Sequence, residues 1–481
     1  MTTPLDLAIR NATVATSRDV TQMDIGIAGG RIVQLGRVGP AAEDVDARGL
    51  IVTPGGVDTH CHLDQVEPGM GNGAETLATG GRSALAGGTT SAVSFLGQIP
   101  DHSLTEVLQE SLRRGEASRI DYSFHQIIND ATPEVMAEVP QIIERGIRSL
   151  KAFLTYDAAR LNDAEFLEVL EAARRGGAMV AVHCENYHAI GWLTKKLLAD
   201  GRTGPKYHAW SRPKVVEREA TYRAICLAEL TGTPIQVFHV SCAEVAEEIA
   251  RAQARGVKVW GETCPQYLVL SEDDMDRPGQ EGAGFMCSPA PRSRADQEGM
   301  WDMIRRGVID VVSSDHSAFN LTGKNGKDAA GPEASFAEIP NGVPGVGARM
   351  PIVFSEGVSK GRITLDHFVR LTAANPAKLY GLAPQKGDIA IGADADLVLW
   401  DAGRKVTLDN AVMQHAVDYT PYAGLEVTGW PVATYLRGTR AMQDGEVLAP
   451  EGAGRFLPRG RYKLAEPSSD VPNGFTAAEI G

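Results

Sequence analysis

Histidine, lysine and aspartate side chains stand at or near the ends of several short apolar segments of this 481-residue chain. Two histidines close the segment PGGVDTHCH, and single residues close or nearly close SLKAF, MVAVH, IQVFH and VVSSD. Imidazole and carboxylate groups are ligands that divalent metals accept in proteins. The pattern predicts a metal centre, whose candidate ligands are His60, His62, Lys151, His183, His239 and Asp315.

The His-x-His pair, His60 and His62, is the first of these signals along the chain. Side chains two positions apart on a strand point to the same face, so both imidazoles face one way and Cys61 faces the other. Alone, such a pair is more often a polar surface feature or a satisfied pair in the core. Its combination with four further ligand-type residues at matching positions favours metal binding.

Lys151 lies in the apolar segment SLKAFL, which disfavours the charged ammonium form and leaves the amine free to react. A neutral amine can take up carbon dioxide, and the resulting carbamate can bridge two divalent cations about 3.5–4 Å apart. Taken alone, a lysine that reaches solvent or pairs with an acid is the more ordinary interpretation. Together with the other candidate ligands, Lys151 is predicted to be N6-carboxylated.

Asp315 suits two tasks, metal ligand and proton shuttle, and a structural N-cap role is compatible with both. Two metals that lower the pKa of a bridging water supply a hydroxide for attack on an amide carbonyl. Asp315 then passes the proton to the leaving nitrogen. The candidate residues therefore predict amide hydrolysis without a covalent intermediate.

These residues need a fold that brings distant segments to one edge. Short apolar runs alternate with amphipathic helical stretches through the middle of the chain, which is typical of parallel strands joined by helices. Eight such strands close into a (β/α)8 barrel, whose active sites form at the carboxyl ends of the strands, where all six candidates fall. The predicted strands are IVTPGGVDTHCH, TTSAVSFL, DYSFHQII, IRSLKAFL, AMVAVHCEN, PIQVFHVS, VKVWGET and IDVVSSDH, and the predicted helices include LTEVLQESLRR, EFLEVLEAARR and EVAEEIARAQA.

The two ends of the chain have a different character from the middle. Apolar and polar residues alternate through the first fifty positions, and a similar texture returns in GDIAIGADADLVLWD and TYLRGTRAMQDGEVL, which is typical of short half-buried strands. We expect both ends to form one small β-sandwich. The predicted domains are a sandwich from residues 1–54 and 385–455, a barrel over 55–384, and a C-terminal extension over 456–481.

Charge and composition exclude several classes of partner. The chain has 61 acidic and 47 basic residues, and its net charge of −14 repels phosphate backbones and anionic lipids. No run approaches the roughly 20 apolar residues of a membrane span, and the start, MTTPLDLAIRNATV, lacks a signal-peptide pattern. The six cysteines are far apart without a C-x-x-C pair, which favours reduced thiols. The sequence predicts a cytoplasmic protein that binds neither nucleic acid nor membranes.

Together, these motifs resemble the amidohydrolase superfamily, and within it the cyclic amidohydrolases of the dihydropyrimidinase and D-hydantoinase type. The resemblance covers almost the whole chain and includes PGGVDTHCHLD, SLKAFLTY, HCENY, YHAWSRP, FHVS, CSPAPR, SSDH, NGVPGVGARMP and NPAKLYGL. It implies a barrel with a β-sandwich, a homotetramer, and two metal ions on the six candidate ligands. Zinc is the implied metal, with manganese or cobalt as alternatives.

The resemblance also implies three residues around the substrate. Tyr156 is expected to hydrogen-bond the developing oxyanion, and Ser288 and Asn341 are expected to hold the ring amide. Each residue also has an ordinary interpretation: a packing aromatic, a turn residue before a proline, and an Asn-Gly turn. Arg160 stands where hydantoinases often carry an aromatic that contacts the substrate's exocyclic group. It either favours an acidic substituent or is a solvated surface residue.

The implied reaction is hydrolytic ring opening of cyclic amides and ureides, such as dihydrouracil and 5-substituted hydantoins, to N-carbamoyl amino acids. Allantoinase or another cyclic imide hydrolase is the alternative among enzymes, because the same metal centre serves that reaction. A catalytically inactive dihydropyrimidinase-like scaffold is the alternative outside enzymes. The complete set of candidate ligands argues against the scaffold.

Overall fold

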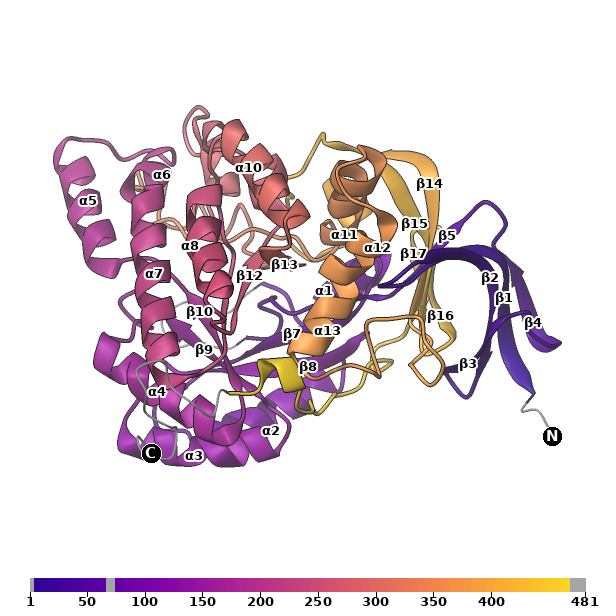
Figure 1. The fold of residues 1–481 in the computed structure, drawn as a ribbon. Helices are drawn as coiled ribbons and strands as arrows, with labels where there is room; N and C mark the ends of the chain where they lie inside the picture. Colours follow the sequence, from indigo (N-terminus) through magenta and orange to yellow (C-terminus); the bar gives the residue numbers. More distant parts are fainter. Residues whose placement is uncertain (1–3, 66–73, 468–481) are drawn as a thin grey trace.

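A parallel barrel forms the centre of the protein, whose computed structural model describes residues 4–65 and 74–467 (Figure 1). Its eight strands follow one another in chain order, and each of the first seven pairs in parallel with the next. An isolated parallel bridge between Cys61 and His316 links the segments that follow the first and last strands. The strands are β6 (Gly56–Asp58), β7 (Thr89–Leu96), β8 (Asp121–Ile127), β9 (Ser149–Phe153), β10 (Met179–His183), β11 (Ile235–Val237), β12 (Val259–Thr263) and β13 (Ile309–Val312).

Amphipathic helices surround the barrel (Figure 1). In α4, Asn162 and Glu165 form a capping box at the start, and Gly177, with φ 65°, ends the helix in the left-handed conformation. The three helices predicted from periodicity are confirmed as α2, α4 and α8. The longer helices are α2 (Leu104–Gly115), α3 (Pro133–Glu144), α4 (Asp163–Gly176), α5 (Tyr187–Ala199), α7 (Lys214–Thr231), α8 (Ala243–Ala254) and α10 (Arg294–Arg305).

Shorter helices connect the remaining segments. They are α1 (Thr79–Ala86), α6 (Tyr207–Ser211), α9 (Gln266–Val269), α11 (Arg349–Val353), α12 (Leu365–Val369), α13 (Asn375–Leu379) and α14 (Asn410–Met413). Among the described residues, no helix has the length and apolar character needed to cross a membrane.

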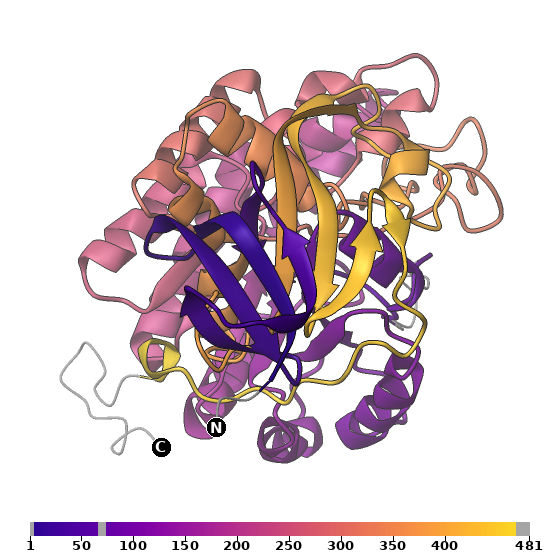
Figure 2. The ribbon, with the colours of Figure 1, turned by 90° about the vertical axis from the view of Figure 1, so that its right-hand side faces the viewer.

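A second, mixed sheet of nine strands combines the two ends of the chain (Figure 2). Its central junction is the antiparallel pairing of β5 with β14, in which Val52 lies opposite Leu399. The sheet has a separate apolar core that includes Ile9, Ile25 and Leu397. Its strands are β1 (Leu5–Ala15), β2 (Val20–Ala28), β3 (Arg31–Gly36), β4 (Ala41–Asp46), β5 (Ile51–Pro54), β14 (Leu397–Thr407), β15 (Glu426–Leu436), β16 (Thr439–Gln443) and β17 (Glu446–Val447).

The predicted fold class, a barrel with a small β module built from both chain ends, is confirmed, whereas the predicted domain limits stay a prediction. One predicted strand, IVTPGGVDTHCH, is divided between the two sheets as β5 and β6. The division falls at Gly55, where an added Cβ would lie 2.1 Å from the Thr90 hydroxyl. The absence of a side chain therefore allows the backbone to pass from one sheet to the other.

The segment that follows the small sheet crosses the amino-terminal end of the barrel. Leu457 N donates to Tyr122 O at 2.7 Å, and Arg459 N donates to Gly146 O at 3.0 Å. Of the predicted C-terminal extension, residues 456–467 therefore contact this chain's own barrel, and 468–481 lie outside the described residues.

Charged side chains are paired at this end of the barrel. The buried Lys386 Nζ lies 2.5 Å from Asp121, 2.7 Å from Asp396 and 3.0 Å from Asp394. Arg437 also contacts Asp121. The base of the barrel is thus joined to the small sheet by buried ion pairs.

Candidate active site

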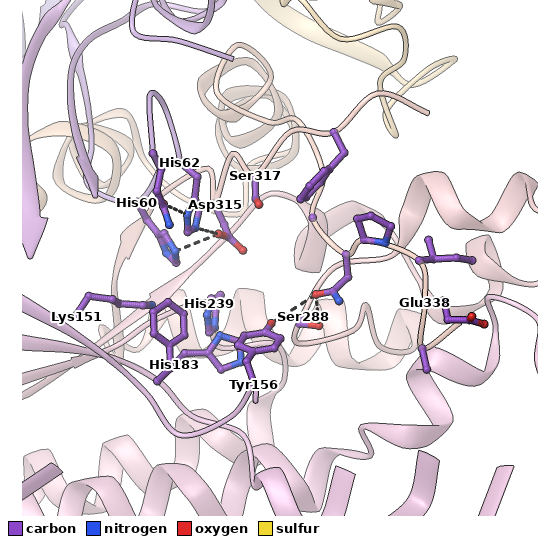
Figure 3. Close-up of a pocket in the computed structure, with 18 residues that line it drawn as sticks. His60, His62, Lys151, Tyr156, His183, His239, Ser288, Asp315, Ser317 and Glu338 are labelled. Atoms are coloured by element: carbon purple, nitrogen blue, oxygen red, sulfur yellow. Dashed lines mark hydrogen bonds and ion pairs between the residues drawn. The ribbon is translucent and has the colours of Figure 1, made fainter. Parts of the chain in front are cut away.

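One cavity of about 320 Å³ opens at the carboxyl ends of the barrel strands. All nine predicted site residues line it (Figure 3). His60, His62 and Asp315 lie on one side of the cavity, and Lys151, His183 and His239 lie on the other. The structure therefore brings the predicted residues together; they are His60, His62, Lys151, Tyr156, His183, His239, Ser288, Asp315 and Asn341.

His60, His62 and Asp315 form the tightest group of ligand-type atoms. One atom from each residue lies within 4.8 Å of the others, a spacing that can accommodate a metal ion. His60 Nε2 is 3.0 Å and His62 Nε2 is 3.4 Å from Asp315 Oδ1. Burial acts to raise the pKa of Asp315, but the neighbouring histidines hold it well below its usual value. Asp315 is therefore a carboxylate at neutral pH.

Glu262 and Gln65 orient these histidines, and sequence reasoning missed both. His60 Nδ1 lies 2.8 Å from Glu262 Oε1, and His62 Nδ1 lies 2.5 Å from Gln65 Oε1. Hydrogen bonds of this kind fix the ring and its tautomer, so that Nε2 faces the cavity. A signal for Glu262 was present, because it is an acid within the predicted seventh strand, VKVWGET.

Lys151 is completely buried on β9. Its Nζ has no hydrogen-bond partner among the described residues, and it lies 4.2 Å from the ring centroid of Phe238 and 4.8 Å from that of Phe153. Burial lowers the pKa of this lysine to about 8. The apolar environment predicted from the sequence is present, and it favours a reactive amine.

His183 and His239 pack edge to face, with ring centroids 4.3 Å apart. Burial lowers the pKa of His183 to about 4 and holds that of His239 well below its usual value. Both imidazoles are therefore neutral at pH 7 and keep a lone pair for a ligand. The buried Nδ1 of His239 has no hydrogen-bond partner among residues 4–65 and 74–467.

Tyr156, Ser288 and Asn341 form a polar cluster at the wall of the same cavity. Ser288 Oγ donates to Asn341 Oδ1 at 2.8 Å, and Tyr156 Oη lies 3.5 Å from the same oxygen. Burial raises the pKa of Tyr156, so its phenol stays protonated and able to donate. Its backbone is strained, with φ 73°.

A buried ion pair connects His183 with Tyr156, and it too was missed from the sequence. Glu185 Oε2 lies 2.8 Å from His183 Nε2 and accepts a hydrogen bond from Arg212 Nη1 at 2.6 Å. The Arg212 guanidinium lies 5.6 Å from the ring centroid of Tyr156. Burial acts to raise the pKa of Glu185, but Arg212 and His183 lower it to about 2. The motifs HCENY and YHAWSRP contain both partners, but the sequence alone does not pair them.

Comparison with known proteins gives consistent matches. The model of the amidohydrolase family matches residues 51–441. A D-hydantoinase from Rhizobium radiobacter is 41% identical over 462 residues, which cover 95% of this chain and 100% of the relative. A D-hydantoinase from Geobacillus stearothermophilus is 40% identical over 469 residues, covering 96% and 98%.

A solved structure agrees in fold as well as in sequence. The dihydropyrimidinase from Brevibacillus agri has a TM-score of 0.91 at 39% identity, covering 95% of this chain and 99% of that one. The family implies a binuclear metal centre, and the group His60, His62 and Asp315 has a spacing that could hold a metal ion. This chain belongs to the amidohydrolase family.

Proposed function

We propose that this protein hydrolyses cyclic ureides, opening hydantoins and dihydropyrimidines to N-carbamoyl amino acids. The observation that carries the proposal is the convergence of nine candidate residues on one cavity in a chain of this family. The names of the relatives, D-hydantoinase and dihydropyrimidinase, support the substrate class.

Two divalent metals fit the residues of the cavity. His60 has carboxylates at both ring nitrogens, at 2.8 Å and 3.0 Å, so a cation between His60 and Asp315 would relieve the clustering of acceptors. On the opposite wall, Lys151 Nζ and His239 Nδ1 are buried polar atoms without hydrogen-bond partners among the described residues. The proposed ligands are His60, His62, carboxylated Lys151, His183, His239 and Asp315, and zinc is the proposed metal, with manganese or cobalt as alternatives.

When bound, such metals activate a water and polarise the scissile carbonyl. The Asp315 carboxylate takes a proton from the attacking water and delivers it to the ring nitrogen that leaves. The Tyr156 phenol donates to the oxygen that gains negative charge. Ser288 and Asn341 hold the ring amide, so that the scissile carbonyl faces the candidate metal ligands.

We further propose a homotetramer in the cytoplasm. Large apolar side chains on α6 and α7 are exposed, and a contact with another subunit would remove them from water; they are Trp210, Val215, Tyr222 and Leu230. The six cysteines are free, which suits a reducing compartment. Light scattering of the purified protein tests the tetramer directly.

The test of function is ring opening by purified protein loaded with zinc, manganese or cobalt. Ring opening is measured as the loss of ultraviolet absorbance of each substrate. The substrates are dihydrouracil, hydantoin, 5-phenylhydantoin, allantoin and dihydroorotate. We expect turnover of the first three and none by Lys151→Ala. Turnover of allantoin alone would favour the alternative cyclic imide hydrolase, and no turnover with any metal would favour the inactive scaffold.

A further inference from the structure

A second, larger cavity of about 880 Å³ adjoins the first. The two cavities share Tyr156, Ala337 and Asn341 in their walls. The second cavity extends from these residues along α5 from Tyr187 to Lys195 and along the loop that precedes α4. A ring held at Tyr156 and Asn341 therefore has this space beside it.

The charged groups of the second cavity are mainly cations. Arg160 and Lys195 line it, and neither has a carboxylate within 4.0 Å among residues 4–65 and 74–467. Arg212 also lines it, but Glu185 neutralises that guanidinium. The one acid in the described lining is Asp157, whose carboxylate accepts a hydrogen bond from the Tyr187 hydroxyl. Neither Arg160 nor Lys195 therefore has an acidic partner within 4.0 Å among the described residues, and Asp157 contributes a single negative charge to the same lining.

Arg160 is held in place without losing its capacity to donate. Its guanidinium lies 4.3 Å from the ring centroid of Tyr187, and its backbone N donates to Tyr156 O at 3.0 Å. Stacking on an aromatic face fixes the guanidinium plane but leaves its N–H groups at the edge, where they can bind a planar anion with two hydrogen bonds. A solvated surface arginine has neither this support nor a cavity in front of it.

We propose that the second cavity binds the anionic end of a substituent on the substrate ring, with Arg160 as the specificity-determining residue. The preferred substrates are cyclic ureides that carry a carboxylate at the end of a flexible side chain. This inference rests on the proposed function, because it extends the substrate of the same site.

The test compares two substrates of nearly equal size, 5-(2-carboxyethyl)hydantoin and 5-(2-carbamoylethyl)hydantoin, at pH 7.5. They differ in charge, since only the first is an anion. We expect the metal-loaded protein to have a kcat/KM about tenfold higher for the acid, which corresponds to about 1.4 kcal/mol. This preference should decrease as salt is raised, because the site is open to solvent.

Variants of Arg160 separate the charge of the residue from its geometry. Arg160→Gln should reduce the ratio of the two kcat/KM values to about one, Arg160→Lys should keep part of it, and Arg160→Glu should reverse it. Arg18→Gln removes an exposed arginine from the turn between β1 and β2 and should leave the ratio as in the unmodified protein. An unmodified ratio near one, or a ratio unchanged in Arg160→Gln, would overturn the proposal.

Dihydrouracil distinguishes failure of this proposal from failure of the proposed function, because it has no substituent. If dihydrouracil is opened but the acid is not preferred, only the anion site is wrong. If dihydrouracil and both hydantoins remain intact with every metal, the proposed function is wrong and the anion site is rejected with it.

Discussion

The two ends of the barrel each contain a buried lysine, and the groups around the two lysines differ. At the amino-terminal end, Lys386 is surrounded by three aspartates within 3.0 Å. At the carboxyl end, Lys151 is also buried, but its amine lies among aromatic rings and has no carboxylate within 4.0 Å among the described residues.

The mouth also contains several residues with a strained backbone, whereas at the base Arg437 has a positive φ, of 48°. Tyr156, His239 and Asp315, all in the cavity, have positive φ values of 73°, 43° and 46°. Such conformations cost about 1–3 kcal/mol each and persist only where the surrounding structure enforces them. The comparison indicates that the base of the barrel stabilises the fold, and that the mouth keeps strained and unpaired groups ready for ligands. Variants at the mouth should therefore lose activity, and variants at the base should lose stability.

The largest effect is expected at the mouth. Lys151→Ala should lower kcat/KM by about 1,000-fold or more, because an essential member of a catalytic set is removed. The melting temperature of the metal-free protein should change little, because loss of a buried amine without a partner offsets part of the cost of the cavity that alanine leaves. Activity, metal content by mass spectrometry and the melting temperature are the measurements. Lys324→Ala, at an exposed lysine, is the control. Retention of full activity and metal by Lys151→Ala would contradict the proposed centre.

The opposite result is expected at the base. Lys386→Met should lower the free energy of unfolding by about 3–5 kcal/mol, because it leaves buried carboxylates without a counter-charge. The activity of each folded molecule should change little, since the site is at the other end of the barrel. Denaturant unfolding measures the loss. Lys405→Met, which breaks the exposed pair with Glu426, should cost less than about 1 kcal/mol. An equal loss of unfolding free energy in Lys386→Met and Lys405→Met would contradict the stabilising role of the ion pairs at the base.

A substitution of Glu262 tests whether its contact with His60 strengthens metal binding or only stabilises the fold. Glu262→Gln keeps the shape of the side chain at His60 Nδ1 but removes the charge. Metal affinity should fall by about 10–100-fold, as for other residues that orient metal ligands. Competition with a chelator measures this affinity, and Glu272→Gln at an exposed position is the control. Unchanged affinity in Glu262→Gln would mean that the contact is only structural.

The last effect is a dependence of stability on pH. Lys327, in the loop that carries Asn341, donates to the carbonyls of Met286 and Pro340, and burial lowers its pKa to about 7. In the unfolded chain the pKa is about 10.4. Between the folded and unfolded pKa values, the unfolded state binds more protons than the folded state. The free energy of unfolding therefore rises with pH by up to about 1.4 kcal/mol per pH unit.

Lys327→Met should abolish that contribution, and its stability relative to the unmodified protein should be greatest below pH 7. Lys386 behaves oppositely, because its three aspartates outweigh burial and raise its pKa. Its stabilising contribution should be complete below about pH 10.4 and be lost as pH rises through the folded pKa. Denaturant unfolding from pH 6 to 10 should show the slope that Lys327 causes and no slope from Lys386, whose contribution is lost only above this range. A parallel pH dependence in the two methionine variants would contradict the comparison.

The sequence predicted the features that depend on local pattern. The barrel strands were found because each apolar run is short and bounded, and the six candidate metal ligands because polar groups at strand ends share one edge of a barrel. Tyr156, Ser288 and Asn341 were predicted from the family resemblance instead. The division of one predicted strand at Gly55 was not predictable, because the partner of β5 comes from the other end of the chain. The contacts of Glu262 and of Arg212 with Glu185 were missed for the same reason, since they depend on tertiary neighbours. The roles of the nine residues stay predictions.

The pairing of β5 with β14 also bears on how the protein is made. The ribosome must synthesise the entire barrel between Val52 and Leu399 before these two residues can meet. Until then, β5 has an open edge that other nascent chains can pair with. A product that stops before Leu397 keeps this edge permanently, so incomplete chains should be the ones that aggregate and are degraded.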